Sequence, residues 1–181
     1  VNITGSSVQK IAVNGTIPGP VLRFTEGEEV VIEVTNRLDQ DTSIHWHGLL
    51  LPGEMDGVPG ANGFPGIKPG TTFTYRFKVR QSGTYWYHAH SLAQEQEGVY
   101  GALVITPRNS DPIHAEYDHV VLFSDFAEED GLEILNNLKI DSGYYNFHKR
   151  TVGDFFRDVK KIGFFAAWQN ALDWGEMRMS Q

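Results

Sequence analysis

Between Val8 and Thr106, short runs of β-branched and aromatic residues alternate with Gly, Pro, Asn and Asp. The alternation is clearest where Val30, Ile32 and Val34 fall on one face of a predicted strand. Such patterning is typical of half-buried strands in an all-β sandwich of about 100 residues. The pattern predicts seven strands, with a Gly- and Pro-rich loop over residues 52–70. These strands are Val8–Val13, Val21–Phe24, Val30–Thr35, Ser43–Leu51, Thr72–Val79, Gly83–His90 and Tyr100–Thr106.

The pattern changes after Pro107, and we therefore expect one domain over residues 1–107 and a different, partly helical segment over residues 108–181. Asp111-Pro112 marks a linker, and one more strand-like run follows it. Apolar residues then recur at helical spacing, and the abundant aromatic residues of this tail indicate an interface. The predicted elements are a strand over His119–Phe126 and helices over Glu128–Leu138, from a capping Thr151 to Val159, and over Phe164–Trp174.

Composition narrows the possible functions. The formal charge of −8 argues against nucleic acid as a partner, because nucleic acid is bound largely through Lys and Arg. No apolar run approaches the roughly 20 residues that span a bilayer. The chain has no cysteine, which rules out disulfides and thiolate metal ligands within it. It opens on Val1 without a secretory signal, which suggests a processed or trimmed start.

Two His-x-His pairs, His45/His47 and His88/His90, hold four of the seven histidines. Each pair lies in a predicted strand, where residues i and i+2 share a face. If the two strands are neighbours, four imidazoles converge on one metal site. Imidazole without thiolate suits copper, zinc, iron or nickel. Cupins and copper–zinc superoxide dismutases also carry His-x-His pairs on strands. The nearby carboxylate ligand of cupins and the usual disulfide of these dismutases are both missing from this chain.

The remaining candidate ligands have ordinary explanations. Three further histidines lack ligand spacing and are expected to be solvated or capping residues: His114, His119 and His148. Met177 and Met179 could bind Cu(I), but packing is the favoured explanation for two methionines beside an arginine. Asp56-Gly57 is a common turn dipeptide, so Asp56 could be structural.

The motifs around the histidine pairs closely resemble the N-terminal cupredoxin domain of multicopper oxidases over residues 8–107. In chain order they are Asn14–Pro20, Glu26–Glu28, Val34–Asn36, Ser43–Gly48, Met55–Pro59, Gly83–His90 and Glu97–Gly101. The tail resembles the copper-resistance oxidases of the CopA type, in the segments Tyr144–Asp158 and Trp174–Met179. In those proteins this stretch leads into the second cupredoxin domain.

The resemblance implies a role for each residue of the site. His45 would be a ligand of the type 2 copper, and three others, His47, His88 and His90, ligands of the type 3 pair. Asp56 would be the carboxylate near this trinuclear cluster that helps to deliver protons. Dioxygen would be reduced there to water while Cu(I) or a phenol-like reductant is oxidised. The family also implies a periplasmic or extracellular location.

The resemblance also shows what this chain lacks. A full cluster needs four more histidines from the last cupredoxin domain, and electrons enter through a type 1 copper with a cysteine ligand. We therefore expect a partial multicopper oxidase, inactive alone, that needs the remaining domains or a partner chain. Two alternatives stay open: a stand-alone module that sequesters copper without turnover, and an assembly role in which the aromatic tail docks. A closed four-histidine site would favour storage, or even zinc.

Overall fold

The computed structural model describes residues 1–109, 114–146 and 151–179, with side chains up to residue 173. The chain divides into two compact units, Val1–Leu135 and Asn136–Gln181, and each is described by itself. Residues 114–135 therefore belong to the compact unit that holds the strands. Whether residues 1–107 form a separate domain stays a prediction.

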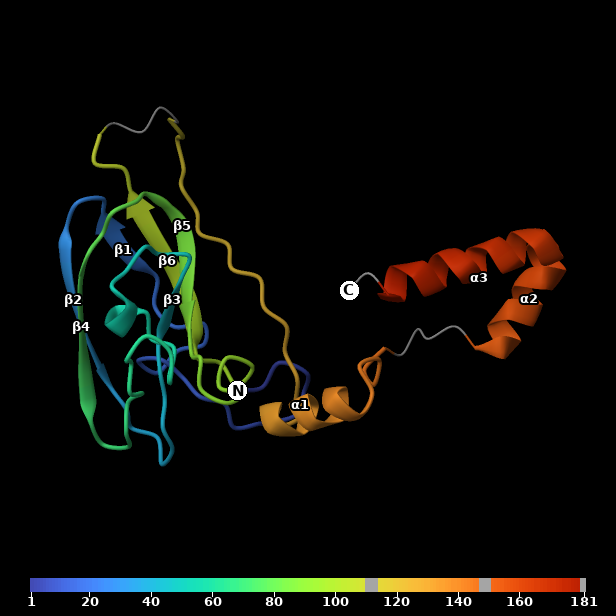
Figure 1. Cartoon of the computed structure of the whole chain (residues 1–181), viewed down its shortest axis with the longest axis horizontal. Helices are drawn as coiled ribbons and strands as arrows, with labels where there is room; N and C mark the ends of the chain where they lie inside the picture. Colours follow the sequence, from blue (N-terminus) through green and yellow to red (C-terminus); the bar gives the residue numbers. More distant parts are fainter. Residues whose placement is uncertain (110–113, 147–150, 180–181) are drawn as a thin grey trace. The chain divides into compact units, whose positions relative to one another are not determined.

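The first unit contains two β-sheets that lie face to face (Figure 1). One has the strand order β1-β6-β5-β3, in which β1 and β6 are parallel and the other pairs are antiparallel; the second pairs β2 with β4 antiparallel. A single 3₁₀ turn, η1 (Gly53–Met55), lies in the long loop. The strands are β1 (Leu22–Thr25), β2 (Glu29–Thr35), β3 (His45–His47), β4 (Thr72–Lys78), β5 (Gly83–His88) and β6 (Tyr100–Thr106).

Side chains from both sheets fill the core between them. Tyr75 and Phe77 of β4 meet Trp46 of β3 at ring-centroid distances of 5.2 and 5.8 Å. Tyr87 of β5 and Leu103 of β6 complete this cluster, and all five side chains are buried. Because strand side chains alternate, burying Trp46 and Tyr87 turns their neighbours on β3 and β5 to the outer face of the sheet.

Three predicted strands differ from the structure. Val8–Val13 is not a strand: Val13 makes one isolated bridge, and the Ile11 amide donates to a loop carbonyl at Glu97. His119–Phe126 is also not a strand, and Phe123 in it is 91% exposed. Both runs are apolar enough for a strand but find no neighbouring strand to pair with. The first histidine strand is shorter than predicted, because Gly48 adopts a φ of +84° directly after it.

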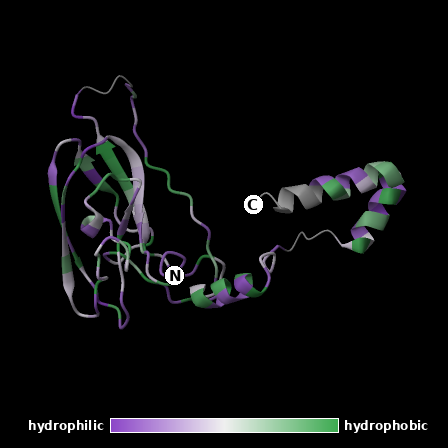
Figure 2. Ribbon diagram, viewed as in Figure 1, coloured by the Kyte–Doolittle hydropathy of each residue, from purple (hydrophilic) through white to green (hydrophobic). Residues whose placement is uncertain are grey.

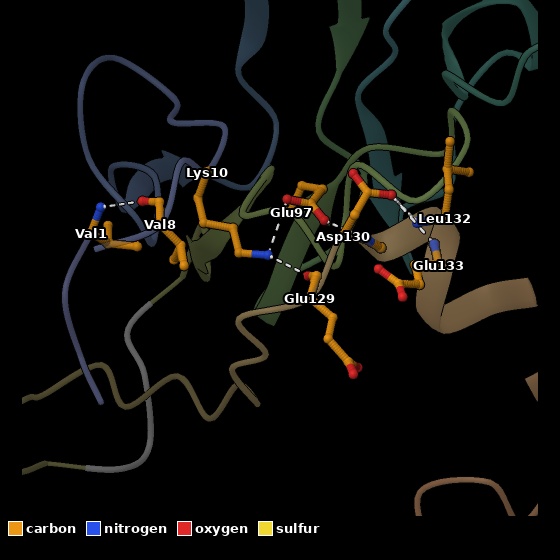
Figure 3. Close-up of polar contacts among 9 residues, drawn as sticks. Val1, Val8, Lys10, Glu97, Glu129, Asp130, Leu132 and Glu133 are labelled. Carbon is orange, nitrogen blue, oxygen red and sulfur yellow. Dashed lines mark hydrogen bonds and ion pairs between the residues drawn. The ribbon is translucent and has the colours of Figure 1, made fainter. Parts of the chain in front are cut away.

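A network of polar contacts fastens the N-terminal segment to the start of α1 (Gly131–Ile140), as Figure 3 shows. Lys10 Nζ lies 3.1 Å from a Glu97 carboxylate oxygen and donates to the Glu129 carbonyl. The other Glu97 oxygen accepts a hydrogen bond from the Gly131 amide. Lys10 and Glu97 are both largely buried, so each neutralises a charge that would be costly to bury alone. The contact joins the loop after the second histidine pair to the segment that leaves the sandwich.

Tyr87 makes the stability of the sandwich sensitive to alkaline pH. Its hydroxyl donates to the Pro20 carbonyl, and burial raises the pKa of Tyr87 to about 12. Above pH 10 the unfolded chain releases this proton while the folded chain retains it, so stability is lost as pH rises from 10 to 12. The free energy of unfolding, measured with urea, should therefore fall between pH 10 and pH 12. In Tyr87→Phe this fall should be smaller by roughly 2–3 kcal/mol. An equally steep decline in the variant would contradict this assignment.

The second unit contains the end of α1 and two further helices, α2 (Val152–Ile162) and α3 (Phe164–Met179), joined at Gly163. Thr151 caps α2 as predicted: its hydroxyl accepts from the Asp154 amide, and the Asp154 carboxylate accepts from the Thr151 amide. Hydrophobic residues lie along both helices (Figure 2), and Phe165 is 86% exposed. Met177 and Met179 fall in α3, outside the described side chains. None of the helices in the described ranges combines the length and apolarity needed to cross a bilayer.

Candidate metal centre

The two histidine pairs meet because β3 and β5 are neighbours in one sheet. The antiparallel register places His45 opposite His88 and His47 opposite Trp86. Trp46, between His45 and His47, lies opposite Tyr87, the residue before His88. Both of these side chains are buried in the core. The period of two along a strand thus places imidazoles from both strands on one face, as the sequence predicts.

The imidazoles lie close enough to share metal ions. One ring nitrogen from each of His45, His47 and His88 lies within 4.8 Å of the others. His90 follows at the end of β5, and its ring centroid is 5.6 Å from His45 and 5.8 Å from His88. All four predicted residues are therefore gathered at one place, and three of them form the tightest group.

The hydrogen bonds of His45 and His88 place the proton of each ring on Nδ1 and the lone pair on Nε2. His45 Nδ1 lies 2.7 Å from the Asp56 carbonyl oxygen, which can only accept, so Nδ1 carries the proton. His88 Nδ1 lies 3.0 Å from the Ala89 carbonyl and is protonated for the same reason. His47 differs, because its Nδ1 faces His88 Nε2 at 3.2 Å. Contacts of this kind fix the tautomer and orientation of metal-binding histidines.

Asp56 reaches the site through a sharp turn. The turn η1 ends at Asp56, and Gly57 follows with a φ of +81°. Gly57 packs so closely against Ile44 that a Cβ atom there would lie 2.6 Å from the Ile44 carbonyl carbon. The turn therefore lies directly on the strand that carries His45. The Asp56 carboxylate is 3.5 Å from His45 Nδ1, so both its backbone and its side chain lie beside this ring.

The four histidines differ in their exposure. His88 is 5% exposed, whereas His47 and His90 are exposed on the surface of the described unit. Burial lowers the pKa of His88 below its usual value, although the Glu95 carboxylate acts in the opposite direction. A neutral imidazole is the form that binds metal. The centre is thus open on one side, with His88 at its base.

The donor set fits copper. It consists of imidazole nitrogens, which bind copper, zinc, iron and nickel, and the chain has no thiolate that would favour a different site. An open arrangement also differs from the closed tetrahedron of a structural zinc site. The residues present therefore fit copper ions that would be completed by ligands from elsewhere.

The other predicted histidines that the structure describes do not belong to the close group of ring nitrogens. His114 and His119 are exposed, and His119 stacks on Tyr117. His148 lies outside the described residues. One partner was missed by sequence reasoning: Glu95, whose carboxylate lies 2.6 Å from His88 Nδ1. No spacing rule identifies it, because the contact depends on how the loop after His90 folds back.

Comparison with known proteins agrees with this geometry. The model of the family described as multicopper oxidase matches residues 1–110. Copper resistance protein A of Escherichia coli is 53% identical over 99% of this chain, and its counterpart from Pseudomonas syringae pv. tomato is 52% identical over the same share. The chain spans only about 30% of the length of either relative.

Solved structures extend the likeness to the fold. A laccase variant from B. aclada is 41% identical and matches 71% of this chain and 24% of its own, with a TM-score of 0.61. A multicopper oxidase from Pseudomonas thermotolerans is 38% identical and matches 60% of this chain and 27% of its own, with a TM-score of 0.56. These matches confirm the predicted cupredoxin-like β-sandwich, and the helices α1, α2 and α3 confirm the partly helical C-terminal segment. The family model covers more than half of the chain, and the chain therefore belongs to the multicopper oxidase family.

Proposed function

We propose that this chain supplies half of the histidine ligands of a trinuclear copper cluster in an oxidase that reduces dioxygen to water. The observation that carries the proposal is the register of β3 against β5, which gathers the ring nitrogens of His45, His47 and His88 within 4.8 Å. Copper bound there would pass electrons to dioxygen. The residues themselves would hold the ions and fix the orientations of the rings.

The hydrogen bonds support a division of the four ligands. His45 would bind the type 2 copper through Nε2, because its Nδ1 is bonded to the Asp56 carbonyl. His88 would bind one type 3 copper through Nε2, and His47 through the Nδ1 that faces it, once the proton that His47 Nδ1 donates to His88 has moved to His47 Nε2. His90, beside both His45 and His88, would be the third type 3 ligand.

The open face of the centre supports completion by other parts of the protein. His47 and His90 are exposed, as expected of ligands that await a facing domain. The chain also has no cysteine, so a type 1 copper with a thiolate ligand would lie outside these 181 residues. We therefore propose that the remaining cupredoxin domains, or a partner chain, supply the other four histidines and the electron entry. The open face favours this assignment over a closed site for storage.

The substrate and location are proposed from the same likeness. The relatives that match nearly the whole chain are named copper resistance protein A, and more distant ones are named laccases. We propose that the complete protein oxidises Cu(I) or a phenol-like reductant and acts in the periplasm or outside the cell. Copper analysis of the full-length protein, with dioxygen uptake measured on Cu(I) and on a phenol, tests this directly. About four coppers per chain and uptake with either reductant would support it, whereas a protein that binds copper without uptake would contradict it.

Asp56 is proposed to deliver protons to the reduced oxygen. Its carboxylate lies beside His45 and is partly exposed, so it can exchange protons with solvent. Only the backbone carbonyl of Asp56 holds the His45 ring at 2.7 Å, and this contact does not depend on the side chain. The side chain is therefore free to act in proton transfer without serving as the support of the ligand.

Asp56→Asn separates these two roles. The variant should keep its copper, because the backbone contact to His45 remains, while dioxygen uptake falls by about 100-fold, as expected for loss of a proton-transfer group. Copper content and initial rates of uptake in the full-length protein measure the two effects. Unchanged uptake would eliminate the proton-delivery role, and parallel loss of copper would make Asp56 a structural support.

A further inference from the structure

Glu95 lies beside the most deeply buried histidine of the centre. Its Oε2 atom is 2.6 Å from His88 Nδ1, closer than the Ala89 carbonyl oxygen at 3.0 Å. An ionised carboxylate can only accept hydrogen bonds, so this contact requires the proton on Nδ1. The Nδ1–H bond itself is donated to the Ala89 carbonyl oxygen, and the Glu95 carboxylate lies beside Nδ1 as a close ion-pair partner whose negative charge favours a proton on this nitrogen.

The His88 ring is held on its other sides as well. Trp86 stacks on it with ring centroids 4.1 Å apart and planes inclined by 16°. With Nδ1 beside the Glu95 carboxylate, the Nε2 atom faces His47 Nδ1 at 3.2 Å. The stack sets the plane of the ring, and the carboxylate sets which nitrogen presents its lone pair to the centre.

The loop that carries Glu95 is anchored by its neighbour. Gln94 is buried, accepts from the Thr42 hydroxyl at 2.6 Å and donates to the Asp41 carbonyl at 2.8 Å. The Glu95 carbonyl accepts from the Gly98 amide at 3.0 Å. The backbone is thus fixed on both sides of Glu95, although its side chain is 49% exposed. A half-exposed side chain on an anchored loop can be replaced without opening the core.

We propose that Glu95 is a positioning residue for His88. The negative charge of its carboxylate, 2.6 Å from Nδ1, holds the proton on that nitrogen and thereby leaves the lone pair on Nε2, directed toward the metal site. The inference rests on the proposed function, because the benefit arises only where His88 is a ligand. Glu95 would act on the metal-binding side chain of His88, and not on dioxygen or on the reductant.

The tautomer of His88 tests the contact without any metal. In metal-free chain labelled with ¹⁵N-histidine at about pH 8, where imidazoles are neutral, the ring nitrogen shifts distinguish Nδ1–H from Nε2–H. Glu95→Ala should raise the Nε2–H population of His88 by about tenfold, as expected for loss of a charged acceptor. Glu95→Gln, which retains an oxygen acceptor, should have a smaller effect. An unchanged tautomer in Glu95→Ala would overturn the proposal.

Copper affinity provides the second readout. In the full-length protein, Glu95→Ala should weaken Cu(I) binding, measured by chelator competition, by about 10- to 100-fold. Asp125→Asn is the matched control: Asp125 lines the same cleft of about 210 Å³ as Glu95, and within the described ranges no hydrogen bond or ion pair joins it to a histidine. An equal loss in Asp125→Asn would overturn the proposal, because the charge of the cleft would then be responsible. Absence of copper binding in the unaltered protein would contradict the proposed function. The tautomer of His88, measured without metal, would still test the role of Glu95.

Discussion

His47→Ala is expected to lower dioxygen uptake by the full-length protein by more than about 100-fold while leaving its fold intact. Changes in residues that merely support a ligand cost 10- to 100-fold, so the loss of a ligand itself should cost more. His47 lies at the end of β3 and is exposed, so its removal leaves no cavity in the core. Uptake, copper content and the thermal unfolding midpoint together measure the effect.

The matched control is His119→Ala. His119 is also exposed, and it stacks on Tyr117 away from the centre, so its loss removes an imidazole without removing a proposed ligand. This variant should retain full uptake and its copper. If His47→Ala retained full uptake, or if the two variants lost activity equally, the proposed cluster would be wrong.

Gly57→Ala should be the most destabilising single substitution near the centre, at a cost of about 2–5 kcal/mol. A residue with a side chain pays about 1–2 kcal/mol to adopt the left-handed φ of +81°. The added Cβ would also overlap the carbonyl oxygen of Ile44, and overpacking typically costs another 1–3 kcal/mol. Relief of this clash would move the turn and draw the Asp56 carbonyl away from His45.

Gly60→Ala isolates the clash from the backbone strain. Gly60 has a similar φ of +77°, but no atom lies within 4 Å of a Cβ built there. It should therefore cost only about 1–2 kcal/mol in urea unfolding and leave copper binding unchanged. Similar losses for both glycines would show that close packing against Ile44 does not hold the turn.

Period-two patterning predicted each half of the candidate centre, but not that the two halves meet. It placed His45 with His47 and His88 with His90 on common faces, and the register of β3 against β5 brings the two pairs together. The pattern of apolar residues also predicted β6 to the residue, as a continuous apolar run that ends before Pro107. It failed for Val8–Val13, since local sequence does not reveal whether a neighbouring strand is present to pair with.

The supports of the histidines were harder to predict. The Asp56 contact to His45 is made by a backbone carbonyl, which every residue possesses, and it depends on the turn at Gly57. The Glu95 contact to His88 depends on a loop anchored by the buried Gln94. Sequence patterns identify residue types that bind metal, whereas these partners are selected by tertiary structure alone.

The most direct test of the account is the position of copper in the full-length protein. A crystal structure with anomalous diffraction recorded at the copper edge would locate each ion without assumptions about its ligands. The account predicts copper within bonding distance of Nε2 of His45, Nδ1 of His47 and Nε2 of His88, with His90 as a further ligand. Copper bound elsewhere, with these four imidazoles free of metal in a copper-replete protein, would contradict it.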